Sequence, residues 1–138
     1  MDDSAHEVPA VDDRDFDLSL DMLCIAHFNG FFRRLNPAWE RALGFTLAEL
    51  QSRPLFDFVH PDDRERTHEQ TRKVRSGEQA PGFENRYVCK DGSYRWCRWN
   101  ARADFDRQLI YSVARDITEQ KRADYERERL VAELRAAL

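Results

Sequence analysis

The side chains with the most potential for chemistry are the histidines, the cysteines and the carboxylates. The histidines are His6, His27, His60 and His68. None of them belongs to an HExxH pattern, and the chain also lacks a GxSxG nucleophile motif and a GxxxxGKS/T phosphate-binding loop. The adjacent carboxylates Asp62 and Asp63 follow Pro61, so they are better explained as the acidic start of a helix. We therefore expect no catalytic site and no metal site.

The cysteines form an odd-numbered set without a CxxC spacing: Cys24, Cys89 and Cys97. This usage is typical of a reduced cytoplasmic compartment rather than of a disulfide framework. All three fall in segments that we predict to be strands, where a buried and unreactive thiol is the usual outcome.

Aromatic side chains are the group best suited to line a binding pocket. Pockets are generally apolar with a few polar anchors, and Asn85 and Arg86 could supply such anchors here. The same aromatic side chains could instead fill a solid core, which we favour, so both alternatives stay open. The strand that contains Trp96 and Trp99 places these two residues on opposite faces. The candidate pocket residues are Trp39, Phe56, Phe58, Asn85, Tyr87 and Trp96, together with Trp99.

Turn and capping signals define the elements of the first half. Asn29-Gly30 lies between the apolar runs MLCIAHF and FFRRLN, which predicts a hairpin. Asn36 and Pro37 can open a helix as its cap and its first residue, and Gly44 can end it. The segment from Thr46 to Glu49 is a capping box for a second short helix.

The second half changes from helix to strand. A helix that starts at residues 61–63 ends in basic residues before Gly77, with Thr67, Thr71 and Val74 as a narrow inward stripe. Asp91-Gly92 then predicts a hairpin between aromatic-rich strands. The resulting order of two strands, short helices, three strands and a long helix predicts an α+β fold. We expect a five-stranded antiparallel sheet with the short helices on one face.

Length and charge exclude several classes of protein. A chain of 138 residues suits one domain with its own core. The formal net charge of -4 argues against nucleic-acid binding, which needs a basic face. No apolar run reaches the roughly 18–20 residues that span a bilayer, so we expect no membrane contact by this segment. Residues 1–12 are polar and do not resemble a signal peptide, and we expect them to be flexible.

Four stretches in this order resemble a PAS domain: NPAWERALGFTLAEL, DFVHPDDRER, GFENRYVCKDGSYRW and VARDITEQKRA. The resemblance implies a cytoplasmic sensor domain over residues 13–117 and a linker helix over 118–138. It implies that Asp116, Ile117 and Thr118 end the last strand and relay a signal to an effector domain of the same parent chain. We expect a sensor histidine kinase as the parent, with a cyclic-dinucleotide enzyme or a transcription regulator as alternatives, and a membrane anchor in that parent stays open.

The resemblance also bears on cofactors. Flavin-binding PAS domains carry a reactive cysteine before the long helix, and the corresponding stretch QSRPLFDFVHPDD has none, which argues against flavin. Haem-binding PAS domains take a histidine from the long helix, where His68 lies. The alternative is a half-exposed histidine on a polar helix. We expect no cofactor and keep a haem-based gas sensor as an alternative function.

The last segment carries a helical pattern. Its heptad-like positions are Ala123, Arg127, Leu130, Leu134 and Ala137. They cover fewer than three heptads, so the start of a parallel coiled coil and a helix that folds back on the sheet stay open. We expect a homodimer, in a non-catalytic domain that relays a signal, with a small-molecule ligand left open. A ligand-free module for dimerisation or interaction is the other alternative.

Overall fold

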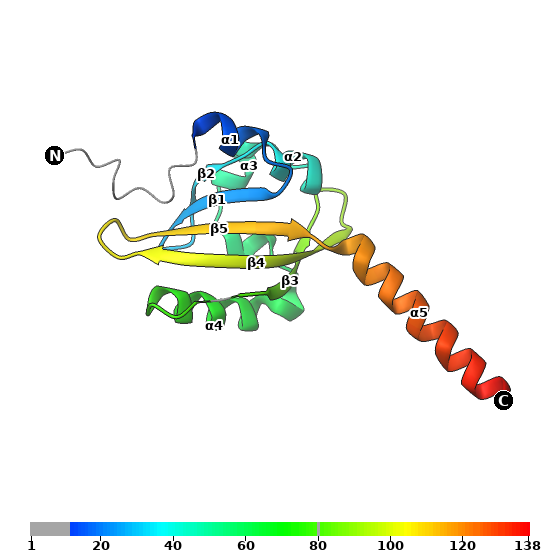
Figure 1. Cartoon of the computed structure of the whole chain (residues 1–138). Helices are drawn as coiled ribbons and strands as arrows, with labels where there is room; N and C mark the ends of the chain where they lie inside the picture. The colour runs from blue at the N-terminus through cyan, green and yellow to red at the C-terminus, as the bar shows by residue number, and fades with distance from the viewer. Residues whose placement is uncertain (1–11, 80) are drawn as a thin grey trace.

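The computed structural model describes residues 12–79 and 81–138, and it confirms the predicted α+β fold (Figure 1). The predicted flexible segment 1–12 lies, except for Asp12, outside the described residues. The strands are β1 (Met22–His27), β2 (Phe32–Leu35), β3 (Phe83–Val88), β4 (Tyr94–Asp104) and β5 (Leu109–Asp116). The helical elements are α1 (Asp13–Leu18), α2 (Ala38–Leu43), α3 (Leu47–Gln51), η2 (Leu55–Phe58), η3 (Pro61–Asp63), α4 (Arg64–Arg75) and α5 (Thr118–Ala137).

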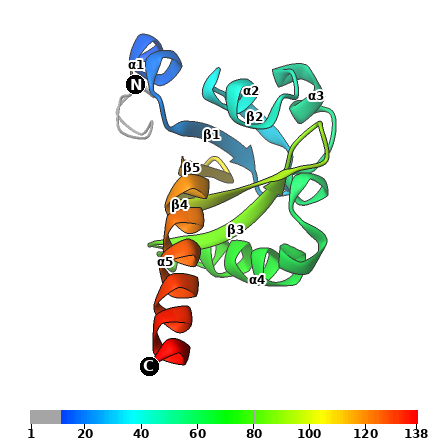
Figure 2. The same cartoon turned by 90° about the vertical axis from the view of Figure 1, so that its right-hand side faces the viewer.

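The five strands form one antiparallel sheet in the order β2-β1-β5-β4-β3. The first and last strands are therefore neighbours at its centre, where Ile25 lies opposite Tyr111. The elements between β2 and β3 cover one face of the sheet, as predicted, and Figure 2 shows α2, α3 and α4 on that side. We call this covered side the inner face and the opposite side the outer face.

The main core lies between the inner face and the short helices. Trp39, Leu50 and Val59 are completely shielded from solvent, and Leu43 and Phe58 are 2% exposed. Burying such large apolar side chains contributes roughly 1.5–3 kcal/mol each, which makes this layer the main source of stability. A smaller cluster joins Val74 of α4 to Ile110 of β5.

Most of the local signals act as predicted. Gly44 ends α2 with a φ of 83°, and the capping box of α3 forms between Thr46 and Glu49. Gly92 adopts a φ of 89° in the turn between β3 and β4. In the first hairpin only Gly30 has a positive φ, while the Asn29 side chain accepts a hydrogen bond from the Phe31 amide.

The predicted cap role of Asn36 is wrong. Its side chain makes no capping bond to α2, which begins without one. Asn36 is fully buried, and its carboxamide accepts a hydrogen bond from the Leu23 amide and donates to the carbonyls of Phe16 and Asp21. These peptide groups would otherwise be buried without partners, so tertiary demand outweighs the local capping preference.

Candidate functional site

The centre of the inner face is a cluster of three aromatic rings from three elements. Trp39 of α2 packs against Tyr87 of β3 and Trp99 of β4, with ring centroids 5.6 Å and 5.7 Å apart. The rings of Tyr87 and Trp99 are 5.5 Å apart. Strand alternation explains the arrangement, because Tyr87 and Trp99 both point inward from neighbouring strands. Two of these rings, those of Tyr87 and Trp99, also line a small cavity.

That cavity has a volume of about 70 Å³ and lies between α4 and the inner face of the sheet. Its polar lining comes from Thr67, Gln70 and Thr71 of α4, Asn85 of β3 and Ser112 of β5, and its other side chains are apolar or aromatic. All of the lining side chains are uncharged. The cavity is far below the roughly 300–1,000 Å³ of a drug-sized ligand pocket, so the aromatic residues mainly fill the core.

The predicted pocket residues separate into three places. Asn85 and Tyr87 line the cavity, as does Trp99. Trp39 and Phe58 belong to the core cluster beside it. Phe56 and Trp96 lie elsewhere, since Phe56 stacks on His68 and Trp96 contacts Lys121. Sequence reasoning missed Gln70 and Ser112 as lining residues, and no spacing signal would have identified them.

Trp96 lies on the outer face because β4 alternates between its two sides. Its neighbours Cys97 and Trp99 are buried, whereas Trp96 is only partly buried and faces Arg86 across the β3–β4 ladder. The guanidinium of Arg86 lies 5.2 Å from the centroid of its ring. The periodicity separated the two faces correctly but could not say which one the helices would cover.

A chain of hydrogen bonds leads from the cavity wall to the start of α4. The Trp99 indole donates to Asn85 Oδ1 over 2.7 Å, and Asn85 Nδ2 donates to Thr67 Oγ1 over 3.1 Å. The Thr67 hydroxyl in turn donates to the Asp63 carbonyl over 2.8 Å. Each of these buried polar groups therefore has a partner, which holds α4 and β3 in one arrangement.

The Asp63 carboxylate joins α4 to the edge strand β3. Its Oδ2 accepts from the backbone amide and Nε of Arg86, over 2.8 Å and 3.0 Å, and its Oδ1 accepts from Arg86 Nη2 over 2.8 Å. The Asp63 side chain is only 4% exposed. Hydrogen bonds from Arg86 lower the pKa of Asp63 and outweigh the opposing effect of burial, so the carboxyl stays ionised.

Two of the three buried thiols, those of Cys24 and Cys97, are held in their protonated form. Burial raises the pKa of Cys24 to about 12 and raises that of Cys97 as well. Cys89 is also buried, although it follows β3 rather than lying in a strand as predicted. A thiol that stays protonated is a poor nucleophile, so neither Cys24 nor Cys97 is suited to covalent chemistry.

The geometry around His68 does not support the haem hypothesis. The imidazole is exposed on α4 and stacks on the Phe56 ring, with centroids 3.7 Å apart. It is absent from the cavity lining, and a cavity of about 70 Å³ has no room for a porphyrin. Among the described residues, no group of three or more histidine, cysteine or acidic side chains could hold a metal ion.

The junction between β5 and α5 is a second site, on the outer face. Asp116 Oδ1 accepts from the Thr118 amide over 2.9 Å and from its hydroxyl over 2.6 Å. Both backbone groups of Trp96 bind here: its amide donates to Thr118 Oγ1 and its carbonyl accepts from the Ile117 amide, each over 2.9 Å. The structure thus brings together the three residues assigned to the relay and attaches them to β4.

Charged groups hold the first turn of α5 to β3 and β4. Lys121 Nζ lies 2.7 Å from a Glu84 carboxylate oxygen and 4.6 Å from the centroid of the Trp96 ring. Glu84 also pairs with Arg98, and hydrogen bonds from Lys121 and then Arg98 lower the pKa of its carboxyl. Beyond this turn α5 leaves the body of the domain, so it does not fold back on the sheet (Figure 1).

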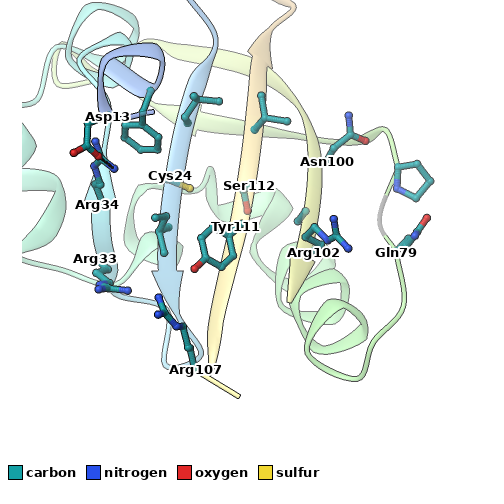
Figure 3. Close-up of a pocket in the computed structure, with 16 residues that line it drawn as sticks. Asp13, Cys24, Arg33, Arg34, Gln79, Asn100, Arg102, Arg107, Tyr111 and Ser112 are labelled. Atoms are coloured by element: carbon teal, nitrogen blue, oxygen red, sulfur yellow. Dashed lines mark ion pairs between the residues drawn. The ribbon is translucent and has the colours of Figure 1, made fainter. Parts of the chain in front are cut away.

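The outer face is open over β1 and β5. A shallow pocket of about 750 Å³ lies here, and Leu23, Ile25, Val113 and Tyr111 are among its lining residues (Figure 3). The basic side chains Arg33, Arg34, Arg102 and Arg107 border it. At the β2 edge α1 is attached to Arg34, whose guanidinium lies 3.9 Å from the Phe16 ring centroid and 3.0 Å from an oxygen of Asp13.

Comparisons with known proteins agree with this geometry. A family model described as the PAS fold matches residues 32–111. The sensor histidine kinase TmoS of Ectopseudomonas mendocina is 30% identical over 105 residues, which are 72% of this chain but only 11% of that protein. This chain therefore spans about a tenth of the length of that relative.

Two crystal structures show the same fold. A domain of a sensory box sensor histidine kinase/response regulator from Geobacter sulfurreducens is 22% identical, with a TM-score of 0.65, over 73% of this chain and 87% of that one. The PAS domain of a protein from Colwellia psychrerythraea is 24% identical, with a TM-score of 0.67, over 78% of this chain and 94% of that one. Likeness at this level of identity describes the fold alone.

Proposed function

The chain belongs to the PAS family, and on that premise we propose that it is a non-catalytic domain that relays a signal within a larger signal-transduction protein. We favour a sensor histidine kinase as the parent, because the curated relative is one. One observation carries the proposal: strands β3 and β4 form both the cavity wall and the anchor of α5. On β3, Asn85 and Tyr87 line the cavity, while Glu84 contacts Lys121 of α5.

This shared use of two strands suggests how the relay works. A change at the cavity that shifts β3 or β4 also moves Glu84 and Trp96, and with them the first turn of α5. Because a helix behaves as a stiff rod, a small rotation at Thr118 is carried to its far end. The output domain would then receive a rotation or a tilt. For this relay to work, the ligand or partner must bind one of the two states of the domain more tightly than the other.

We place this domain in the cytoplasm, as a homodimer. The exposed apolar residues of α5 include Leu130 and Leu134, which are 47% and 67% exposed. Exposed apolar stripes of this kind mark sites of association. The open outer face over β1 and β5 supplies further apolar area. Within the described residues, no helix is long and apolar enough to cross a membrane.

A ligand-free interaction module remains the second candidate, because the inner face is largely filled with side chains. In that case partner binding at the outer face, rather than occupancy of the cavity, would move α5. Filling the inner cavity with a larger side chain, as in Ala101→Leu, would then leave the output of the parent protein unchanged. Loss of regulation in that variant, with the fold intact, would favour the cavity as the input.

The relay is tested by insertions into α5 of the full-length parent. The insertions follow Arg122, so that the contacts of Thr118 and Lys121 stay intact. One added residue rotates everything beyond it by about 100°, whereas seven residues restore the face with a drift of about 20°. We expect the output to depend on insertion length with a period near seven. Equal output at every length would show that α5 is a passive tether.

A further inference from the structure

The size of the inner cavity limits what it can bind. A cavity of about 150 Å³ accommodates benzene, which has six heavy atoms, so each heavy atom needs roughly 25 Å³. The volume of about 70 Å³ beneath α4 therefore suits about three heavy atoms, or four if neighbouring side chains shift slightly. This space is too small for a nucleotide or a porphyrin.

The Tyr87 hydroxyl is the chemical feature that points to a ligand. Tyr87 is 1% exposed and lines the cavity, yet its hydroxyl takes part in no hydrogen bond within the described part of the chain. Among the same residues, no side-chain nitrogen or oxygen is both sealed from solvent-sized space and without a partner. The hydroxyl therefore borders the cavity. Burial raises its pKa, so it remains a donor at neutral pH.

The other polar side chains that line the cavity differ in how many hydrogen bonds they already make. Asn85 binds Trp99 and Thr67, and the Thr71 hydroxyl donates to the Thr67 carbonyl. The carboxamide of half-buried Gln70 borders the cavity from α4 and makes no hydrogen bond within the described part of the chain. Tyr87 is thus the deeply buried donor that a ligand would satisfy, and Gln70 is a second contact near it.

Charge determines the class of ligand. Every side chain that lines the cavity is uncharged, so an ionised ligand would lose its hydration without gaining a counter-charge. We propose that this cavity binds an uncharged molecule of about three or four heavy atoms that accepts a hydrogen bond from the Tyr87 hydroxyl, such as a short ketone, aldehyde or amide. The inference deepens the proposed function by naming the class of molecule that would act at its input.

The test uses acetone as the probe and the three tryptophan indole signals in a ¹⁵N–¹H correlation spectrum as reporters. Trp99 lines the cavity, Trp39 packs against Tyr87, and Trp96 lies on the outer face. Acetone should shift the Trp99 signal saturably, with a dissociation constant in the millimolar range, and leave Trp96 unmoved. Acetate, which has the same shape but a charge, should bind at least tenfold more weakly, and so should cyclohexanone, which has seven heavy atoms.

Tyr87→Phe removes the hydroxyl and keeps the ring, so acetone should bind about three- to tenfold more weakly to this variant. The matched control is Tyr125→Phe, which makes the same change on exposed α5 and should bind acetone like the original chain. If Tyr87→Phe does not fold, the comparison of acetone with acetate and cyclohexanone on the original chain decides.

Three results would overturn the inference. The first is no saturable shift of Trp99 with any probe, which means that the cavity holds only water. The second is equal binding of acetate and acetone, and the third is equal affinity of a folded Tyr87→Phe variant. None of these results bears on the insertion test of α5. A chain that binds acetone but tolerates every insertion would keep the ligand class and lose the relay.

Discussion

Asp63 shows how much one side chain can decide at the residue scale. It is the second acidic residue after Pro61, and sequence reasoning explained it only as part of a helix start. In the structure its side chain is 4% exposed and both oxygens bind Arg86, while its exposed neighbour Asp62 lies on the surface. The ion pair between Asp63 and Arg86 therefore joins α4 to β3, the edge strand that carries part of the cavity wall.

We expect Asp63→Ala to lower the free energy of unfolding by about 2–4 kcal/mol, because it leaves the half-buried Arg86 guanidinium without its partner. Chemical denaturation monitored by tryptophan fluorescence measures the change. Asp62→Ala is the control, and it should stay within about 0.5 kcal/mol of the original chain. A loss as large in the control would mean that the acidic turn, rather than the ion pair, stabilises the domain.

The same residue predicts how stability depends on pH. The folded pKa of Asp63 is lower than its unfolded value of about 3.9, so the unfolded chain binds the proton more readily. Its contribution is complete above the unfolded pKa and is lost as pH falls through the folded one. Melting temperatures from pH 6 down to pH 2 should therefore decline more steeply for the original chain than for Asp63→Asn. Parallel curves would contradict this assignment.

At the scale of elements, the hairpin between β3 and β4 depends on one backbone conformation. Gly92 has a φ of 89°, and a Cβ added there would meet no heavy atom of the described residues within 4 Å, its chain neighbours aside. Any cost of substitution is therefore backbone strain alone. We expect Gly92→Val to destabilise by about 1–3 kcal/mol, and Gly92→Asn by clearly less, because asparagine tolerates positive φ. Equal melting temperatures of the two variants would argue against strain as the cause.

The start of α5 depends on a single hydroxyl. Thr118 Oγ1 accepts from the Trp96 amide and donates to Asp116, so Thr118→Val removes both bonds. We expect hydrogen exchange at the Lys121 amide, which closes the first turn, to accelerate about tenfold, corresponding to about 1.4 kcal/mol. Thr118→Ser keeps the hydroxyl and should exchange like the original chain. Unchanged exchange in the valine variant would show that Lys121 and Glu84 alone hold the helix.

At the scale of the whole molecule, association should use one side of α5. Leu130 and Leu134 share a face with Ala123 and Ala137, while Tyr125 lies about 160° away around the helix. We expect Leu130→Glu with Leu134→Glu to weaken self-association at least tenfold, as measured by light scattering across a dilution series. Tyr125→Glu adds a charge to the opposite side and serves as the control. Equal loss in both variants would mean that net charge, not the seam, controls association.

The helices and strands were predictable from the sequence, because the signals that specify them are local. The glycine of the Asp91-Gly92 turn, the capping box at Thr46 and the αL glycine at position 44 act within a few residues of chain, so they operate as predicted. The periodicity of β4 likewise separated Trp96 from Trp99. These features, in their order along the chain, also sufficed to recognise the family.

The packing of distant segments, by contrast, set which face of the sheet became the inner one and which partner each buried polar group binds. Helix packing buried Trp99 and left Trp96 on the outer face, where it contacts Lys121 of α5. Side-chain alternation along β4 does not determine which of the two faces the helices cover. Asn36 does not cap α2, because its side chain instead forms hydrogen bonds with buried peptide groups of Leu23 and Phe16. The cavity is built by side chains from several separate elements, and the Tyr87 hydroxyl finds no hydrogen-bond partner within the described part of the chain. Such facts depend on distances between segments, which no local pattern encodes.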